Sequence, residues 1–442
     1  MNLRRELGLR DLTLFAIACI VGTRWIASAA HAGSGSILLW VLAALFFLIP
    51  LAVATAALTA KNPEAGGLYL WTRNDFGPWH GFLAFWVYWM GIAFWFPSAA
   101  MFYMSIAVSA LGPRFEYLAS SRSALLAASL TAIWIALGTN LVGVKIGKWT
   151  ENLGAIAAWL LAAVLVTVAA LVSHQRGPAT TLHLLPDWNW DTMGLLATIA
   201  YAMTGFEMAG LMGGEIRHPE RDLRHAAWLS SLFVTLFYAA ATAAMLILLR
   251  PENISELNGI AQAGTEAARV LGIPWLPQVM AVLVVATAVG QFGGLGASVS
   301  RMPFAAGVDH LLPAAFAKIH PRWATPYISM LTLGAIASLL LIATQFGDTI
   351  RGAYQTLVSL MVIAGFLPYL YMFGSAWKVG RHLSAVCGWT ITVLAVACSV
   401  VPTAEIHNIW LFECKLAAGT FAVIASAWLV YNRAQSGAKL IS

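Results

Sequence analysis

Twelve long apolar runs alternate with short polar connectors along the chain. The runs cover residues 12–31, 36–60, 80–111, 122–141, 151–173, 192–214, 224–250, 275–303, 326–344, 352–376, 385–403 and 409–431. A helix needs about 20 mostly apolar residues to cross the hydrocarbon core of a bilayer. The pattern therefore predicts an all-α integral membrane protein with about twelve transmembrane helices and no soluble domain between them.

Composition excludes the soluble classes of protein. Hydrophobic residues make up 60% of the chain and charged residues 10%, whereas a soluble domain carries about 25% charge. The net charge of +6 is therefore expected to mark loops beside the lipid bilayer, and we expect no nucleic-acid partner. His31, His80 and His310 show no metal-ligand spacing, so we predict neither a metal nor another cofactor.

The distribution of Lys and Arg predicts an orientation. With the N-terminus inside, the inner segments hold 17 of the 25 Lys and Arg residues and the outer segments hold six. This asymmetry is typical of a multi-pass protein with both termini in the cytoplasm, and we expect it in the cell membrane. The remaining two, Arg24 and Lys415, lie in apolar runs, and Lys415 is close enough to a span end to reach water.

Two of the apolar runs are interrupted by glycine. The first contains "VGTR" at residues 21–24, and the sixth contains "MTGFE" at residues 203–207. Interrupted spans at matching places in two halves point to an inverted repeat. The sixth span follows the first by five positions. Because five is an odd number, the second half would be inserted upside down.

A broken helix in lipid exposes backbone groups that protein or water must satisfy. The N-terminus of the second half-helix favours an anion, and the carbonyl end of the first half-helix can receive an ammonium. We expect Gly22 and Thr23 to supply such groups in the first span, and Thr204, Gly205 and Phe206 in the sixth. Together they predict a mid-membrane site for zwitterions, although a packing glycine in each span is the simpler interpretation.

Arg24 and Glu207 are the formal charges deepest in the apolar runs, where an unpaired charge is costly. One interpretation is a structural ion pair between them. Another is that Arg24 recognises a substrate carboxylate through its planar guanidinium. Glu207 could also carry a coupling proton, or link the sixth span to its neighbours. The sequence leaves these alternatives open.

Three stretches resemble the amino acid–polyamine–organocation transporters. They are "NPEAGGLYLWTRNDFGPWHGFLAFW" (62–86), "YAMTGFEMAGLMGGEIRHPERDLRHA" (201–226) and "SRMPFAAGVDHLLPAAFAKIHPRWATP" (300–326). The resemblance runs in order over nearly the whole chain. It implies the five-plus-five inverted-repeat fold of the leucine transporter, with helices 1 and 6 broken. The repeats would be 1–175 and 176–378, with 379–442 holding two appended helices and the tail.

The same resemblance implies positions for the substrate. The family motif in the first span is usually Gly-Ser/Ala-Gly-Ile-Phe, whose backbone binds the substrate carboxylate. The corresponding residues here are Gly22, Thr23, Arg24, Trp25 and Ile26. The second glycine has become Arg24, which puts the usual carboxylate position in question.

In the sixth span, the gate aromatic of the family falls on Tyr201 and the backbone break on Thr204 and Gly205.

Two further stretches are interpreted from their residues alone, without the family resemblance. The glycines of "GQFGGLG" (290–296) favour close helix packing, although Gln291 can reach the site. The aromatic stripe "FWVYWMGIAFWF" (85–96) is expected to be a packing or lipid-facing surface rather than a substrate wall.

The function these features predict is secondary transport of amino acids or related zwitterions and anions by alternating access, through exchange or proton coupling. Arg24 places acidic amino acids first, and the glutamate–GABA antiporter branch shares a departure from the glycine-rich first span. The alternatives are a polyamine or other amine permease, or a non-transporting membrane sensor. An enzyme would need a nucleophile–base set or metal cluster, which the apolar runs lack. Substrate, driving ion and oligomeric state stay open.

Overall fold

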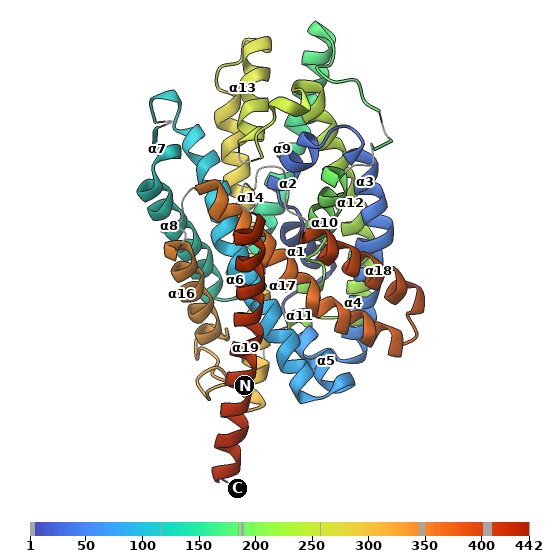
Figure 1. The fold of residues 1–442 in the computed structure, drawn as a ribbon, viewed down its shortest axis with the longest axis vertical. Coiled ribbons are helices and arrows are strands. Elements are labelled where there is room, and N and C mark those ends of the chain that lie inside the picture. The colour runs from blue at the N-terminus through green and yellow to red at the C-terminus, as the bar shows by residue number, and fades with distance from the viewer. Residues whose placement is uncertain are drawn as a thin grey trace.

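The computed structural model describes residues 5–115, 117–183, 185–186, 190–256, 258–343, 350–400 and 409–441. These residues form a bundle of helices (Figure 1), and no strand occurs among them beyond one parallel bridge between Leu7 and Ile216. The helices as far as residue 176 are α1 (Leu9–Ile20), α2 (Arg24–His31), α3 (Ser36–Ala43), the π-helical turn η1 (Ala44–Leu48), α4 (Ile49–Lys61), α5 (Gly67–Phe76), α6 (Pro78–Ala110), η2 (Pro113–Phe115), α7 (Tyr117–Ser120), α8 (Arg122–Leu141) and α9 (Val144–Arg176).

The remaining helices complete the bundle. They are α10 (Trp190–Ala202), α11 (Glu207–Leu211), η3 (Gly213–Glu215), α12 (Pro219–Leu248), η4 (Pro251–Asn253), α13 (Gly259–Leu271), α14 (Leu276–Val299), α15 (Arg301–Val308), α16 (Tyr327–Ala343), α17 (Ile350–Lys378), α18 (His382–Ser399) and α19 (Ile409–Ile441). Figure 1 shows α13 at one end of the bundle and α5 at the opposite end.

The membrane-spanning helices of the structure confirm the prediction of an all-α integral membrane protein. Within the described ranges, nine helices are long and apolar enough to cross a bilayer, and α1 with α2 makes a tenth if the bent pair is one span. The apolar helix α16 falls just short in length, and α10 and α11 are two short pieces. The count of twelve therefore stays a prediction.

The local sequence explains where several of these helices begin and end. Pro219 starts α12 at a position where its missing N–H costs nothing, and Glu220 and Asp222 follow in the first turn, where negative charge is favoured. Gly272 ends α13 in the left-handed conformation, the usual way for a helix to stop. These rules operate unchanged in a membrane protein.

Both glycine-containing interruptions coincide with helix ends. The helix α1 stops at Ile20 and α2 starts at Arg24, with a bend of 49° between them. In the sixth run, α10 stops at Ala202 and α11 starts at Glu207. The chain between each pair leaves the helical path at the predicted "VGTR" and "MTGFE" stretches.

The long helices pack in two groups with further helices between them. One group contains α1, α2, α4, α11 and α12, and the other contains α6, α8, α14 and α16. The helix α9 packs against both α12 and α14, while α17 packs against both α4 and α6. At the α9–α14 contact, a side chain on Gly290 would stand 2.8 Å from the Cα of Gly154, so this glycine has the predicted packing role.

Candidate functional site

The two interruptions lie directly against each other. A Cβ on Gly205 would come within 3.1 Å of the backbone carbon and oxygen of Cys19, at the end of α1. Gly205 also has a φ of +121°, which a residue with a side chain rarely adopts. Only glycine therefore allows the break of the sixth run to rest on the break of the first.

The Tyr238 hydroxyl of α12 satisfies backbone groups from both breaks. It accepts a hydrogen bond from the Gly22 N–H at 2.9 Å. As a donor it lies 3.0 Å from the carbonyl oxygen of Ile20 and 3.3 Å from that of Ala202. One buried hydroxyl thus replaces helix hydrogen bonds that α1 and α10 lose where they stop. Sequence reasoning missed this residue, because nothing in "LFYAAAT" distinguishes it from a packing tyrosine.

Glu207 is buried, with 1% of its surface exposed, and its carboxylate is surrounded by donors. It accepts hydrogen bonds from the hydroxyls of Tyr88 on α6 and Tyr369 on α17. It also accepts one from the Gly205 N–H at 2.9 Å. Glu207 therefore joins the sixth run to two neighbouring helices, which is the structural role among the alternatives that the sequence left open.

Arg24 is equally buried, with 1% exposed, but its partners are neutral. Its guanidinium donates to the Ser98 hydroxyl at 3.0 Å and to the Met361 sulfur at 3.4 Å. The guanidinium carbon also lies 4.1 Å from the ring centre of Trp25 and 5.7 Å from that of Trp95. Cation–π contacts offset part of the cost of burying this charge. In the described part of the chain, no carboxylate lies within ion-pair distance of it.

The expected ion pair between Arg24 and Glu207 is therefore not present in this structure. Both residues contact α6 and α17, but at different heights. Ten residues separate Tyr88 from Ser98 on α6, a helical rise of about 15 Å. The Arg24 guanidinium is instead surrounded by a hydroxyl, a sulfur and two indole rings. The Glu207 carboxylate is surrounded by two hydroxyls and a backbone N–H.

A small cavity lies between these two levels. On α6 it is lined by Tyr88, Ile92 and Trp95, and on α17 by Gly365 and Tyr369. It offers about 20 Å³ to the centres of water molecules, which is room for about one water. The structure thus represents a closed conformation of the site.

Part of the predicted binding set lines this cavity. The predicted residues on its wall are Trp25, Tyr201, Thr204, Gly205, Glu207 and Gln291. The predicted residues that are not on its wall are Gly22, Thr23, Arg24, Ile26 and Phe206, of which Arg24 stacks on the Trp25 ring. On the side of the first break, the cavity wall therefore contains the neighbouring side chain of Trp25 but not Gly22 or Thr23 of the break itself.

Aromatic side chains form much of the wall. The rings of Trp25 and Tyr201 meet edge to face, with centroids 6.0 Å apart. Tyr88 and Trp95 belong to the aromatic stripe at residues 85–96, and both are buried and packed against other rings, as expected of a packing surface, while they also line the cavity. Tyr88, Ile92 and Trp95 share one face of α6 at helical spacing, but this helix is apolar and buried on nearly all sides, so the sequence alone did not single that face out.

Gln291 connects α14 to the first break. Its amide nitrogen donates to the Cys19 carbonyl oxygen at 3.3 Å, and its amide oxygen accepts from the Tyr103 hydroxyl at 2.6 Å. This arrangement satisfies another carbonyl left free where α1 stops. Gln291 lies on the cavity wall, and its contact with a substrate stays a prediction.

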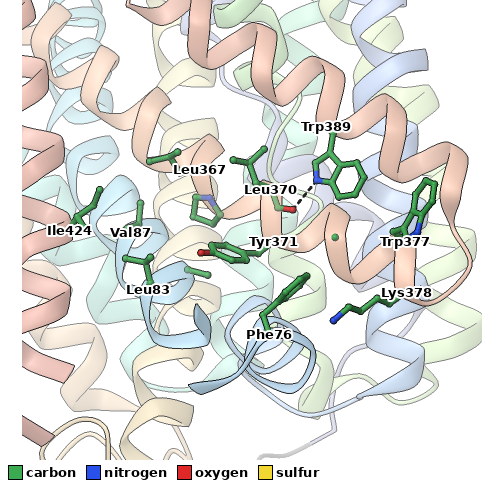
Figure 2. A pocket seen from close by; sticks show the side chains of 13 residues that line it. Phe76, Leu83, Val87, Leu367, Leu370, Tyr371, Trp377, Lys378, Trp389 and Ile424 are labelled. Carbon is green, nitrogen blue, oxygen red and sulfur yellow. Dashed lines mark hydrogen bonds between the residues drawn. The ribbon is translucent and has the colours of Figure 1, made fainter. Parts of the chain in front are cut away.

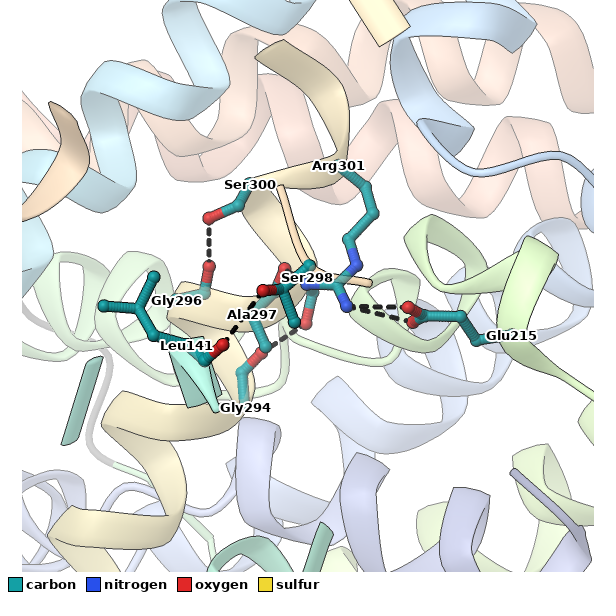
Figure 3. A network of polar contacts seen from close by, with 9 residues as sticks. Leu141, Glu215, Gly294, Gly296, Ala297, Ser298, Ser300 and Arg301 are labelled. Atoms are coloured by element: carbon teal, nitrogen blue, oxygen red, sulfur yellow. Dashed lines mark hydrogen bonds and ion pairs between the residues drawn. The ribbon is translucent and has the colours of Figure 1, made fainter. Parts of the chain in front are cut away.

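At one end of the site, a buried ion pair holds the two packing groups together. Arg301, at the start of α15, donates to both carboxylate oxygens of Glu215, at 2.8 and 3.1 Å (Figure 3). Neither residue exposes more than 1% of its surface. The same guanidinium donates to the Ala297 carbonyl of α14. The pair fixes η3, directly after the sixth run, against the other helix group.

A second cluster lies nearby, beyond the membrane spans. Asp309 accepts hydrogen bonds from the Tyr69 hydroxyl and the Arg73 guanidinium of α5. Burial and the Asp309 carboxylate raise the pKa of Tyr69, so its hydroxyl stays protonated as a donor. The two clusters close the same end of the bundle.

Comparison with known proteins identifies the family. The family model described as amino acid permease matches residues 7–426. The chain belongs to this family. This permease is also similar to an uncharacterized transporter of Legionella pneumophila, 25% identical over 96% of each chain. It is 24% identical to the serine/threonine exchanger SteT of Bacillus subtilis, over 78% of each chain.

A solved structure supports the fold. The permease matches MhsT in complex with L-phenylalanine with a TM-score of 0.64, at 16% identity, covering 97% of this chain and 99% of that one. The all-α permease therefore has the leucine-transporter-like fold implied by its sequence motifs, and it is a multi-pass membrane protein that transports amino acids. Within the described ranges, no group of three or more His, Cys, Asp or Glu side chains is arranged to hold a metal.

Proposed function

We propose that this permease carries amino acids across the cell membrane by alternating access, with the substrate held between Glu207 and Arg24. The observation that carries the proposal is a cavity with the Glu207 carboxyl on its wall and, also on its wall, the Trp25 indole on which the buried Arg24 guanidinium stacks. A zwitterion placed there would direct its ammonium toward the Glu207 carboxylate and its carboxylate toward the start of α2. A solute without both charges would leave one of them unmatched.

The start of α2 is the proposed carboxylate site. The first N–H groups of a helix have no partner four residues back; in α2 those of Trp25 and Ile26 donate to the Gly22 and Thr23 carbonyls, which leaves the N–H of Arg24. The Thr23 hydroxyl is buried, with no hydrogen-bond partner among the described residues. A carboxylate at the first break would accept from both kinds of donor. Gly22 is already engaged by Tyr238, so Thr23 and the helix start carry this role.

Arg24 is the proposed anchor for an additional acidic group. Its guanidinium stacks on Trp25, whose indole lines the cavity. A rotation of the indole would bring the cation and the cavity together, and an acidic amino acid would then supply the anion that Arg24 lacks. This supports the order of substrates predicted from the sequence, with acidic amino acids before neutral ones and polyamines last. The likeness to the glutamate–GABA antiporter branch remains a prediction.

Glu207 is the proposed proton-coupling group if transport follows a pH gradient. Its carboxylate faces the cavity and is held by hydroxyls on α6, a member of one packing group, and on α17, which contacts both groups. Protonation would remove its charge and weaken the bonds from Tyr88 and Tyr369. If transport is exchange alone, Glu207 serves only to fix the sixth run and to receive the substrate ammonium.

The topology belongs to the same proposal. Residues 1–175 and 176–378 would be the two inverted repeats and residues 379–442 the appended helices and tail, with both termini in the cytoplasm. The Lys and Arg asymmetry supports this orientation. The Glu215–Arg301 pair would then close the cytoplasmic side of the site.

Transport in proteoliposomes tests the function. Uptake of labelled acidic and neutral amino acids, dicarboxylates and polyamines would be measured with and without a pH gradient, and with unlabelled substrate inside. We expect uptake of at least one amino acid, stimulated by the gradient or by internal substrate. Accumulation of a polyamine alone, or of none of these solutes, would contradict the proposal.

A further inference from the structure

A second, much larger cavity lies on the outer side of α17, away from the closed site. Its volume is about 630 Å³, whereas the volume of the central cavity is about 20 Å³. Its walls come from α5, α6, α17, α18 and α19, and its lining includes Leu83, Val87, Leu367, Trp389 and Ile424 (Figure 2). The wall is almost wholly apolar, so the cavity suits hydrocarbon rather than a polar solute.

One end of this groove carries a fixed cation. The Lys378 ammonium, at the last residue of α17, lies 4.1 Å from the ring centre of Phe76 and donates to the Asp75 carbonyl (Figure 2). An ammonium has three donors, so two remain for a ligand. The Asp75 carboxylate is directed to Lys61, at 3.9 Å, and Arg381 lies exposed three residues beyond Lys378. The groove mouth is therefore positively charged.

The length of the groove matches one leaflet of a bilayer. Eleven residues of α17 separate Leu367 from Lys378, a rise of about 16 Å, close to half of a hydrocarbon core of about 30 Å. A narrow extension between α6, α17 and α19 continues from Leu367 past Leu360. Trp377 and Trp389 flank the charged end, where tryptophans of membrane proteins meet the lipid headgroups.

We propose that this groove binds one anionic phospholipid, with its acyl chains against α6, α17 and α19 and its phosphate at Lys378. A zwitterionic lipid would fill the same apolar wall, but its headgroup carries no net charge for the cation to attract. The lipid would hold the outer face of α17, whose other face presents Tyr369 to the central cavity. The inference does not depend on which solute the permease carries.

Native mass spectrometry of the purified full chain tests this site, with dioleoyl phosphatidylglycerol and dioleoyl phosphatidylcholine added in turn. We expect the wild type to retain one phosphatidylglycerol with about fivefold preference, the factor that one lysine adds to binding at an anionic surface. Lys378→Gln should remove that preference. Leu83→Trp, which fills the groove, should reduce retention of both lipids. The matched control is Arg433→Gln, which removes an exposed cation of α19 that does not line the groove.

Several outcomes would overturn the proposal. Equal retention of both lipids by the wild type would show that the cation does not select a headgroup. A preference that persists in Lys378→Gln, or that is lost equally in Arg433→Gln, would place the anion elsewhere. A dimer that Leu83→Trp dissociates would show that a second copy of the chain occupies the groove. Thermal melting of each variant in detergent checks that it is folded.

Discussion

Arg24 and Glu207 contact the same two helices, α6 and α17, at different heights, and do not contact each other. Arg24 contacts these helices through Ser98 and Met361, whereas Glu207 does so through two tyrosine hydroxyls. Each charge thus ties an interrupted span to both neighbours. The Glu207 carboxyl lines the cavity between these heights, whereas Arg24 stacks on Trp25, whose indole lines it.

This geometry predicts the result of exchanging the two charges. If the residues formed an ion pair, Arg24→Glu combined with Glu207→Arg would partly restore the function lost in either single variant. Because their partners are different and far apart, we expect no rescue in proteoliposome uptake or in thermal stability. Recovery of the double variant above both single variants would show that the two side chains pair in some state.

Replacing Glu207 by Gln tests the proton-coupling role. Gln keeps the shape and an acceptor for Tyr88 or Tyr369, but it cannot titrate. We expect Glu207→Gln to lose stimulation by a pH gradient while substrate exchange across proteoliposomes continues at a reduced rate. Gradient-driven uptake that survives the substitution would exclude Glu207 as the proton carrier and leave it a structural link.

The Tyr238 hydroxyl should be needed for stability. Tyr238→Phe leaves the Gly22 N–H and the Ile20 carbonyl without their partner, and an unsatisfied buried group costs about 1–3 kcal/mol. We expect a lower melting temperature and slower transport. Tyr431→Phe is the control, because Tyr431 contacts Trp79 and Phe82 through its ring. Equal melting of the two variants would show that the hydroxyl does not support the breaks.

Substitution by alanine should be tolerated at Gly138 and not at Gly205. Gly205→Ala would force a side chain into the left-handed region and against the Cys19 backbone, so we expect loss of transport and a lower melting temperature. Gly138→Ala, in α8, meets nothing within 4 Å. It should leave transport unchanged and add up to about 1 kcal/mol of stability. A fully active Gly205→Ala protein would contradict the close contact between the breaks.

Breaking the Glu215–Arg301 pair should destabilise the closed end. Removing one member of a buried ion pair costs about 3–5 kcal/mol, so Glu215→Gln should favour conformations open on that side. A cysteine introduced at Thr204, in the cavity wall, would then react faster with a thiol reagent added to that side. The double variant Glu215→Leu, Arg301→Met should recover melting temperature. Unchanged labelling in Glu215→Gln would show that the pair does not control access.

The sequence predicted the features that depend on local chemistry. Glycine in "VGTR" and "MTGFE" located both interruptions, because a break in a membrane helix needs glycine and leaves a recognisable signal. The aromatic at Tyr201 and the amide at Gln291 were also placed at the cavity. Each of these follows from the type of residue at a helix end or within a family motif.

The features that depend on packing between distant segments could not be predicted. Tyr238 lies 216 residues from the Gly22 N–H that it satisfies, and no local pattern connects them. Likewise, the expected pairing of Arg24 with Glu207 rested on the cost of burial alone. The structure meets that cost differently, through indole rings around one charge and tyrosine hydroxyls around the other.

The most direct test is a structure of the permease with the amino acid that gives the largest thermal shift. The account predicts that the substrate lies between the two breaks, with its carboxylate within hydrogen-bond distance of Thr23 or the Arg24 backbone N–H and its ammonium directed toward Glu207. Substrate bound away from both breaks, or with its carboxylate beside Glu207, would contradict it.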